Sequence, residues 1–293
     1  MKTVFLFIDK AHFISDLLST NYICYLSSKY KVVLFTRDID QKKAYENNYF
    51  QSPNLTYLKW KPKNSTLLDL MKFIRFSCIR EFDYLDTVKL YRKRRDQDNE
   101  KTLLRFISKP FAFFLTANFF NKVESFFCKG SREFAGYCKK YNPILTLVAT
   151  PGINNFEAEA IILSKKYDIK TVSIDCNWDG LTTRATRIRS PDYFIAWHEP
   201  MRQEAIKIHH YDPNRVFVSG PVRFDYHFTR EEYILSHEEF LISKGLDPKY
   251  KTILYTTQKG HLFEEGFVKN LIYLRDSGLI PYVNIFLRVH PVA

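Results

Sequence analysis

The stretch from residue 169 to residue 225 constrains the fold most, because short apolar runs alternate in it with polar and amphipathic segments. Apolar runs predict strands at 169–174, 193–197 and 216–219, and residues 199–209 have helical spacing. Strands that alternate with helices are typical of a parallel sheet covered by helices. In such sheets ligands bind at the carboxyl ends of the strands. A polar loop follows the first of these strands, so we expect a site there.

The beginning of the chain predicts a β-α-β unit. Residues 3–8 and 31–36 are apolar strand candidates, and residues 11–29 between them have apolar side chains close to helical spacing. The connection after the first strand, residues 9–12 (DKAH), has none of the glycines of a GxGxxG turn. We therefore do not expect a dinucleotide to be held there in the Rossmann manner.

Two domains are predicted. The first, 1–220, is an acceptor-side Rossmann-like domain with a helical region at 66–141, and it ends where Gly220-Pro221 breaks the pattern. The second, 221–293, contains two strand candidates, 252–256 and 283–288, joined by one helix. Two strands and one helix do not bury both faces of a sheet. We therefore expect an α/β fold of two Rossmann-like domains, the second of them incomplete.

Two carboxylates, Asp175 and Asp179, lie in the loop after strand 169–174. Either carboxylate can act as a general base toward a hydroxyl, and either can instead cap backbone N–H groups. Asn177 adds an amide, and Trp178 can stack on a sugar or base or pack beneath the loop. No third carboxylate lies nearby in the sequence, so no metal site is predicted.

A second group of donors follows the two strands of the second domain. Arg288 and His290 are separated by one residue, so both can face one side and bind a phosphate. Thr256, Thr257 and Gln258 end the neighbouring strand and add hydroxyl, amide and backbone donors. A structural His-Pro turn is the alternative interpretation of the first pair.

The chain has a formal net charge of +12, which favours an anionic partner. Residues 89–95 (KLYRKRR) hold five cations, either on a solvated helix end or in a patch that contacts an anionic membrane. No nucleic-acid motif accompanies them, so we expect no nucleic-acid partner. The five scattered cysteines and the lack of a signal peptide or an uninterrupted apolar span favour the cytoplasm.

Five motifs, in this order and spacing, carry a resemblance to a known family: SIDCNWDGLTTR, PDYFIAWHEPMRQEAIKIH, RVFVSGPVRFDYHF, KTILYTTQ and IFLRVHP. Over about residues 145–291 the chain resembles bacterial surface-polysaccharide glycosyltransferases of the GT-B type. It is more distantly similar to the CDP-glycerol glycerophosphotransferase group. That group carries Trp-His-Gly, with a candidate catalytic His, where this chain has Trp178-Asp179-Gly180, so the resemblance shifts the base role to Asp179.

The resemblance implies transfer of a sugar from a nucleotide-activated donor to a hydroxyl of a saccharide or lipid-linked acceptor in cell-surface polysaccharide synthesis. Asp179 would take the acceptor proton, Asp175 would orient the loop, and Arg288 and His290 would bind the donor phosphates. We expect Arg223, in the third motif, to bind substrate as well. The donor is a substrate, so no cofactor is expected.

Two alternatives remain open. One is alditol-phosphate transfer of the glycerophosphotransferase kind, and the other is an inactive, truncated, membrane-associated binding protein. Peripheral contact with the anionic inner face of the cell membrane fits each of these interpretations.

Overall fold

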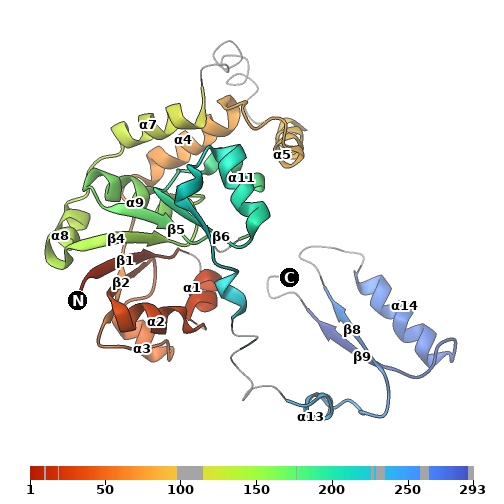
Figure 1. The fold of residues 1–293 in the computed structure, drawn as a ribbon. Coiled ribbons are helices and arrows are strands. Elements are labelled where there is room, and N and C mark those ends of the chain that lie inside the picture. Colours follow the sequence, from red (N-terminus) through yellow and green to blue (C-terminus); the bar gives the residue numbers. More distant parts are fainter. Residues whose placement is uncertain are drawn as a thin grey trace. The chain divides into compact units, whose positions relative to one another are not determined.

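The computed structural model describes residues 1–9, 11–18, 20–97, 115–175, 177–225, 228, 235–257 and 264–289. The chain forms two compact units, Met1–Thr229 and Arg230–Ala293 (Figure 1). Each unit is described by itself below.

The first unit is built on a seven-stranded parallel sheet with the order β3-β2-β1-β4-β5-β6-β7. The chain runs outward from β1 in one direction, returns, and continues from β4 in the other. This reversal between β1 and β4 is the topological switch point, where open α/β sheets bind ligands. The strands are β1 (Thr3–Phe7), β2 (Lys31–Thr36), β3 (Leu55–Lys59), β4 (Pro143–Val148), β5 (Lys170–Ser173), β6 (Tyr193–Ala196) and β7 (Val216–Val218).

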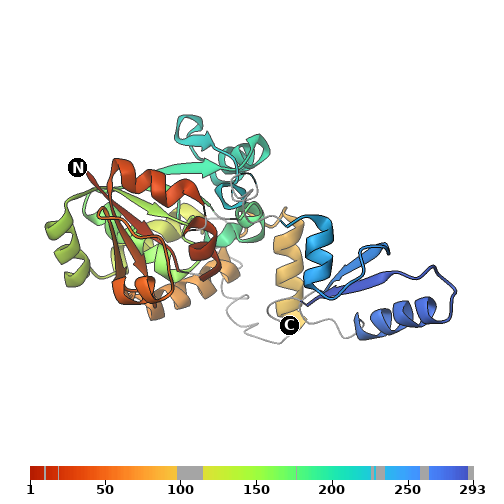
Figure 2. The ribbon, with the colours of Figure 1, turned by 90° about the horizontal axis from the view of Figure 1, so that it is seen from below.

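Alternate side chains of the central strands enter two separate cores, as the two-residue period of a strand requires. On one face Leu6 packs with α1 (Ala11–Leu18), α2 (Asn21–Lys29) and α3 (Gln41–Glu46). On the other face Phe7 joins an aromatic cluster with residues of α8 (Arg132–Tyr141) and α9 (Asn155–Lys166), and its ring stacks on Phe35 at 4.5 Å between centroids. Figure 1 shows α1, α2 and α3 on one side of the sheet and α9 on the other, and Figure 2 views the first unit from the side of α1, α2 and α3. Both faces are therefore covered, as the parallel strands require.

The single helix predicted over 11–29 is wrong in one respect, because it is two helices. Thr20 separates α1 from α2: its Oγ1 donates to the carbonyl of Leu17 at 2.8 Å and accepts from the N–H of Tyr22 at 3.3 Å. The side chain of Thr20 thus replaces backbone hydrogen bonds that would have continued α1. It also caps the N-terminus of α2, so a new helix begins there.

The predicted helical region contains α4 (Ser65–Cys78), α5 (Asp86–Gln97), α7 (Ala117–Phe127) and α8. A buried charge cluster fixes α4 and α7 to the loop that follows α10 (Gly180–Thr183). Arg75 donates at 2.8 Å to the carbonyls of Thr186 and of Ile188, and Glu124 accepts from Arg75 at 3.3 Å and pairs with Arg189 at 2.7 Å. These three charged side chains are almost fully buried, so each depends on its partners.

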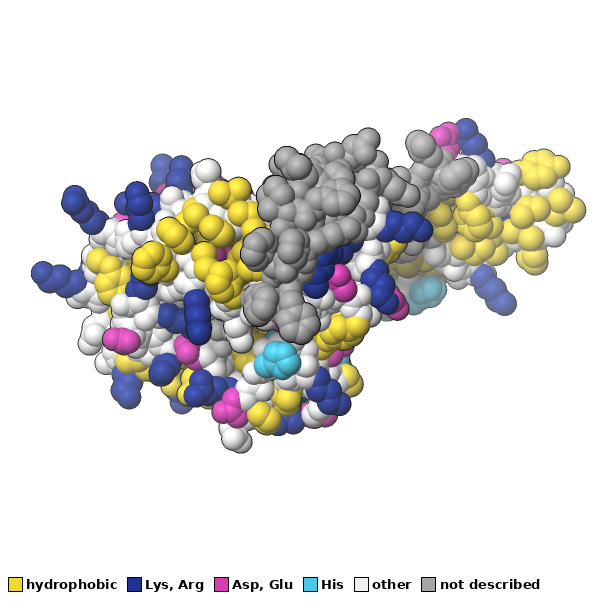
Figure 3. Space-filling model, turned by 90° about the horizontal axis from the view of Figure 1, so that it is seen from above, with side chains coloured by type: hydrophobic (Ala, Val, Ile, Leu, Met, Phe, Trp, Pro, Cys, Tyr) yellow, Lys and Arg dark blue, Asp and Glu magenta, His cyan; other side chains and the backbone are white. Residues whose placement is uncertain are grey.

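The basic run 89–95 on α5 is not wholly solvated. Arg92 is buried, donates to the carbonyl of Ile79 and pairs with Asp83 at 3.0 Å. This cation therefore anchors α5 to the turn after α4, while Arg94 stays exposed. Figure 3 shows lysine and arginine side chains spread over the face seen from above, with hydrophobic side chains gathered between them. No helix in the described ranges is long and apolar enough to cross a bilayer.

The second unit has a parallel pair of strands, β8 (Thr252–Thr256) and β9 (Asn284–Arg288), with α13 (His237–Ser243) and α14 (Glu264–Asp276). Tyr255 stacks with Phe267 of α14 at 4.9 Å, and Phe286 meets Phe240 of α13 at 5.6 Å. Phe286 pairs in register with Leu254, and successive side chains of a strand point to opposite faces. The contact of Phe286 and the contact of Tyr255 therefore lie on opposite faces of the strand pair.

Candidate functional site

The loops after β1, β4 and β5 meet at the switch-point edge of the first unit. The turn after β4 depends on Gly152, whose φ is +77° and where an added Cβ would lie 2.5 Å from Cγ of Arg189. A side chain at this position would meet both strain and a clash. The turn continues into Asn154, whose Oδ1 accepts from the N–H of Glu157 at 3.0 Å and begins α9. Thr150, Ile153 and Asn154 of this turn line the cavity described next, together with residues of the polar loop after β5.

A cavity of about 110 Å³ lies where these loops converge. It brings Asp179 and Asn177 from the loop after β5 together with residues of α1 and of the loop after β4. Its walls offer hydroxyl, amide, carboxylate and guanidinium groups beside two apolar side chains. The lining residues are Phe13, Thr150, Ile153, Asn154, Asn177, Asp179, Gly180, Thr183 and Arg184.

Asp179 holds the position before α10. Its backbone carbonyl accepts from the N–H of Thr183 at 2.9 Å, and its Oδ2 lies 3.4 Å from Oγ1 of the same threonine. Asp179 makes no side-chain cap bond to the helix N–H groups. The capping alternative is therefore wrong for this carboxylate, which lines the cavity instead.

Asp175 lies beneath the loop and is fully buried. Its Oδ1 accepts from the N–H of Asn177 at 3.1 Å, and its backbone carbonyl accepts from Nε1 of Trp197 at 2.7 Å. Its Oδ2 packs against Gly180, where a Cβ would lie only 3.1 Å away. Burial raises the pKa of Asp175 well above its usual range, and the nearby charge of Asp179 raises it further. Asp175 therefore caps a backbone N–H group, which is the alternative interpretation of this carboxylate, and its role in orienting the loop for catalysis stays a prediction.

Neither Trp178 nor Arg223 is among the residues that line the cavity. The indole of Trp178 is 63% exposed, so the alternative in which it packs beneath the loop is wrong. Arg223 lies in the short helix η3 (Val222–Phe224), after the domain boundary predicted at residue 220, and η3 packs on α1 within the first unit. The guanidinium of Arg223 lies 5.6 Å from the ring of Phe224.

The predicted phosphate residues of the second unit are neighbours where the structure describes them. Thr256 pairs in register with Arg288, and the N–H of Thr257 donates to the carbonyl of Arg288 at 3.0 Å. Gln258 and His290 lie outside the described residues. The strand ends thus bring one guanidinium and two hydroxyls to the same edge of the pair.

Sequence reasoning missed a buried carboxyl group at the same edge, that of Glu157 on α9. It is fully buried and accepts a hydrogen bond from Oγ1 of Thr150. Burial, with a smaller contribution from the charges of Asp9 and Asp175, raises its pKa to about 8. The only signal in the sequence was a glutamate three residues after Asn154, a pattern that a helix cap explains by itself. No group of three or more His, Cys, Asp or Glu side chains suited to a metal ion occurs among the described residues.

No protein-family model and no curated protein matches the chain. Two solved structures have TM-scores of 0.52: MnaA from S. aureus solved with UDP, at 8% identity, and a putative UDP-N-acetylglucosamine 2-epimerase from Listeria monocytogenes, at 11%. The matches cover 99% of this chain but only 62% and 63% of those chains. They confirm the predicted fold class, an α/β fold of GT-B-like, Rossmann-type units.

Proposed function

We propose that the protein is a glycosyltransferase that moves a sugar from a nucleotide-activated donor to a hydroxyl of a saccharide or lipid-linked acceptor. The observation that carries this proposal is the cavity at the switch-point edge, where Asp179 lies among hydroxyl and amide groups. Such groups both donate and accept, as recognition of sugar hydroxyls requires. The GT-B-like fold supports the proposal.

In the proposed reaction Asp179 acts as the general base. Its carboxylate takes the proton of the acceptor hydroxyl while the oxygen attacks the anomeric carbon of the donor. The bond from that carbon to the donor phosphate oxygen breaks, and its electron pair leaves with the phosphate. Asn177 binds a hydroxyl of the acceptor, Trp178 stacks on a sugar ring, and Arg223 adds a cation near this edge.

The donor phosphates are assigned to the second unit. Arg288 supplies a guanidinium, which matches phosphate geometry, and Thr256 and Thr257 supply hydroxyls. Gln258 and His290 belong to the same proposed set. These groups would offset the negative charge that develops on the departing phosphate. Donor binding and base catalysis are therefore assigned to different units, as the family resemblance implies.

A role in cell-surface polysaccharide synthesis at the inner face of the membrane is the finer part of the proposal. Its support is the exposure of Phe119, Phe126 and Phe127 on α7, in the same helical region 66–141 as the basic run on α5. Exposed aromatic side chains and cations suit an anionic lipid surface.

A second candidate reaction is epimerisation of a nucleotide sugar, which the buried acids Glu157 and Asp175 favour. Burial raises the pKa of both carboxyl groups, and the pKa of Glu157, about 8, lets that group hold a proton near neutral pH. Transfer is preferred because neither carboxyl group is among the residues that line the cavity.

Product analysis distinguishes these reactions. The protein is incubated with a panel of nucleotide sugars and CDP-glycerol, with and without saccharide acceptors, and the products are separated by mass spectrometry. The proposal predicts release of nucleoside diphosphate and an acceptor heavier by one sugar, only when both substrates are present. An isomerised donor without acceptor would establish epimerisation, and an acceptor heavier by glycerol phosphate would establish alditol-phosphate transfer. Either of these results alone would contradict the proposal.

A further inference from the structure

A larger cavity, of about 530 Å³, lies between α4, α5 and the segment that follows α10. It shares Thr183 and Arg184 with the cavity that contains Asp179, so the two cavities meet at a common wall. Its volume lies within the range of roughly 300–1,000 Å³ typical of small-molecule sites. We call it the cationic pocket, after Lys72, Arg94, Arg184 and Arg187 in its lining.

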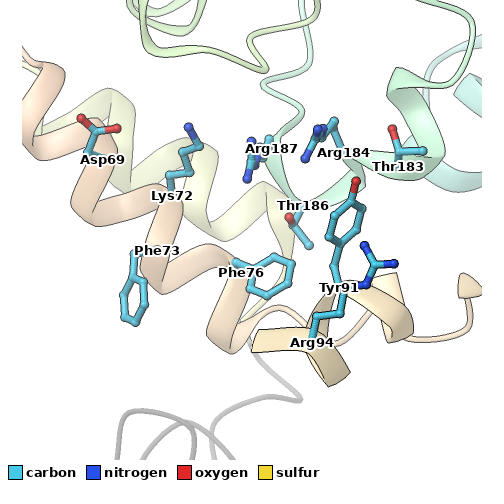
Figure 4. Close-up of a pocket in the computed structure, with 10 residues that line it drawn as sticks. All are labelled: Asp69, Lys72, Phe73, Phe76, Tyr91, Arg94, Thr183, Arg184, Thr186 and Arg187. Carbon is cyan, nitrogen blue, oxygen red and sulfur yellow. The ribbon is translucent and has the colours of Figure 1, made fainter. Parts of the chain in front are cut away.

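Positive charge dominates the cationic pocket. One carboxylate, Asp69, lines it against those four cations, and its Oδ1 already accepts from Nδ2 of Asn155 at 2.7 Å. Figure 4 shows the nitrogens of Lys72, Arg184 and Arg187 along one side of the pocket. Burial lowers the pKa of Lys72, and the positive charge of Arg187 lowers it further. The cations thus lie close enough to repel one another, which a bound anion would relieve.

The backbone that carries Arg187 is positioned by the fold itself. The carbonyls on both sides of Arg187 are held by Arg75, at 2.8 Å each, and its own carbonyl accepts from Nη1 of Arg189 at 2.6 Å. Arg184 lies over the ring of Tyr91 at 5.3 Å. The backbone around these cations is therefore fixed before a ligand arrives, which reduces the entropy cost of binding.

The chemistry of the lining indicates the ligand. Guanidinium groups match the geometry of phosphate oxygens, and lysine adds a compact charge. Phe76 and Tyr91 add two aromatic rings to the lining, that of Tyr91 beside the guanidinium of Arg184 (Figure 4). This combination suits a phosphate or diphosphate ester whose organic part packs on the rings.

We propose that the cationic pocket binds a phosphate or diphosphate ester of the acceptor. The acceptor hydroxyl then reaches Asp179 in the neighbouring cavity, past Thr183 and Arg184, which line both cavities. This inference rests on the proposed function and adds that the acceptor is anionic. The phosphate belongs either to a soluble saccharide phosphate or to the head group of a lipid diphosphate, since both have the same anionic chemistry.

Calorimetric titration without a donor tests the site. The probes are inorganic diphosphate, a saccharide 1-phosphate, and a polyprenyl diphosphate in detergent micelles. We expect at least one ester to bind the parent protein, and Lys72→Met and Arg187→Met each to raise its Kd by about tenfold or more. The exposed residues Arg132 and Lys139 on α8 are the controls, and Arg132→Met and Lys139→Met should leave the Kd unchanged. The ester that binds more tightly identifies the source.

Three results would overturn the site: no ester binds the parent, the pocket variants bind as the parent does, or the control variants lose as much affinity. Circular dichroism of each variant checks folding, and the titration of the parent needs no variant. Ester binding that depends on Lys72 and Arg187, in a protein that transfers no sugar, would overturn the proposed function and support the site. Transfer to a phosphorylated acceptor that neither variant affects would support the function and overturn the site.

Discussion

Replacement of Arg75 by methionine tests whether the buried charge cluster holds α4 and α7 to the segment that follows α10. Methionine keeps much of the volume but removes the bonds to the carbonyls of Thr186 and Ile188, each 2.8 Å, and one of the two partners of Glu124. Burial lowers the pKa of Arg75 to about 9, so the group is still charged at pH 7. Loss of one partner from a buried pair costs about 3–5 kcal/mol.

We therefore expect Arg75→Met to reduce the free energy of unfolding by about 3–5 kcal/mol, measured by urea denaturation at pH 7. Lys89→Met is the control, because the pair of Lys89 with Asp86 is exposed and such pairs contribute about 0–1 kcal/mol. Arg75→Met should also weaken ester binding, because Thr186 and Arg187 line the cationic pocket. A decrease in the free energy of unfolding of less than about 1 kcal/mol would refute the reasoning, because the buried charge cluster would then contribute little to stability.

Two further predictions concern the edge itself. Glu157 has a pKa raised from 4.5 to about 8, so its contribution to stability is fully present below pH 4.5 and is lost as pH rises through 8. Between these two pH values the free energy of unfolding of the parent should fall by about 1.4 kcal/mol per pH unit relative to that of Glu157→Gln. Urea denaturation of both proteins at pH 5 and pH 8 measures this difference. The same pH dependence in both proteins would contradict the prediction. Trp178→Ala should raise the KM for the acceptor severalfold while the unfolding free energy changes by no more than about 0.5 kcal/mol, and a large loss of stability would mean that the indole is packed.

The sequence predicted the sheet well because each strand is a short apolar run bounded by polar or turn residues. Residues 31–36, for example, bury five of six side chains in β2, and a strand of a parallel sheet that is covered on both faces requires so continuous an apolar run. The polar loop after β5 could be located for the same reason, because a strand fixes where its carboxyl end lies. The helix break at Thr20 was missed because its apolar spacing continues through the break.

Residues that act through long-range contacts could not be predicted. Arg75 lies in an amphipathic helix like many exposed arginines, and only the folded chain brings Glu124 and the carbonyl of Thr186 to it. The cationic pocket likewise joins residues 72, 94 and 184–187, which are far apart in the sequence. Glu157 was hidden by a pattern that a helix cap accounts for. Local propensity contains no information on such partners, which depend on tertiary packing.

The most direct test of the account is the turnover of Asp179→Asn with a nucleotide sugar and a hydroxyl acceptor. Asparagine has a similar shape but takes no proton, so we expect kcat to fall by about 10²–10⁴-fold while the Kd of the donor is nearly unchanged. Asn214→Asp is the control, because it makes the reverse exchange at an exposed residue of the short helix η2 (Pro213–Arg215) before β7. It should leave kcat and the Kd of the donor unchanged. Turnover of Asp179→Asn equal to that of the parent would contradict the assignment of Asp179 as the base.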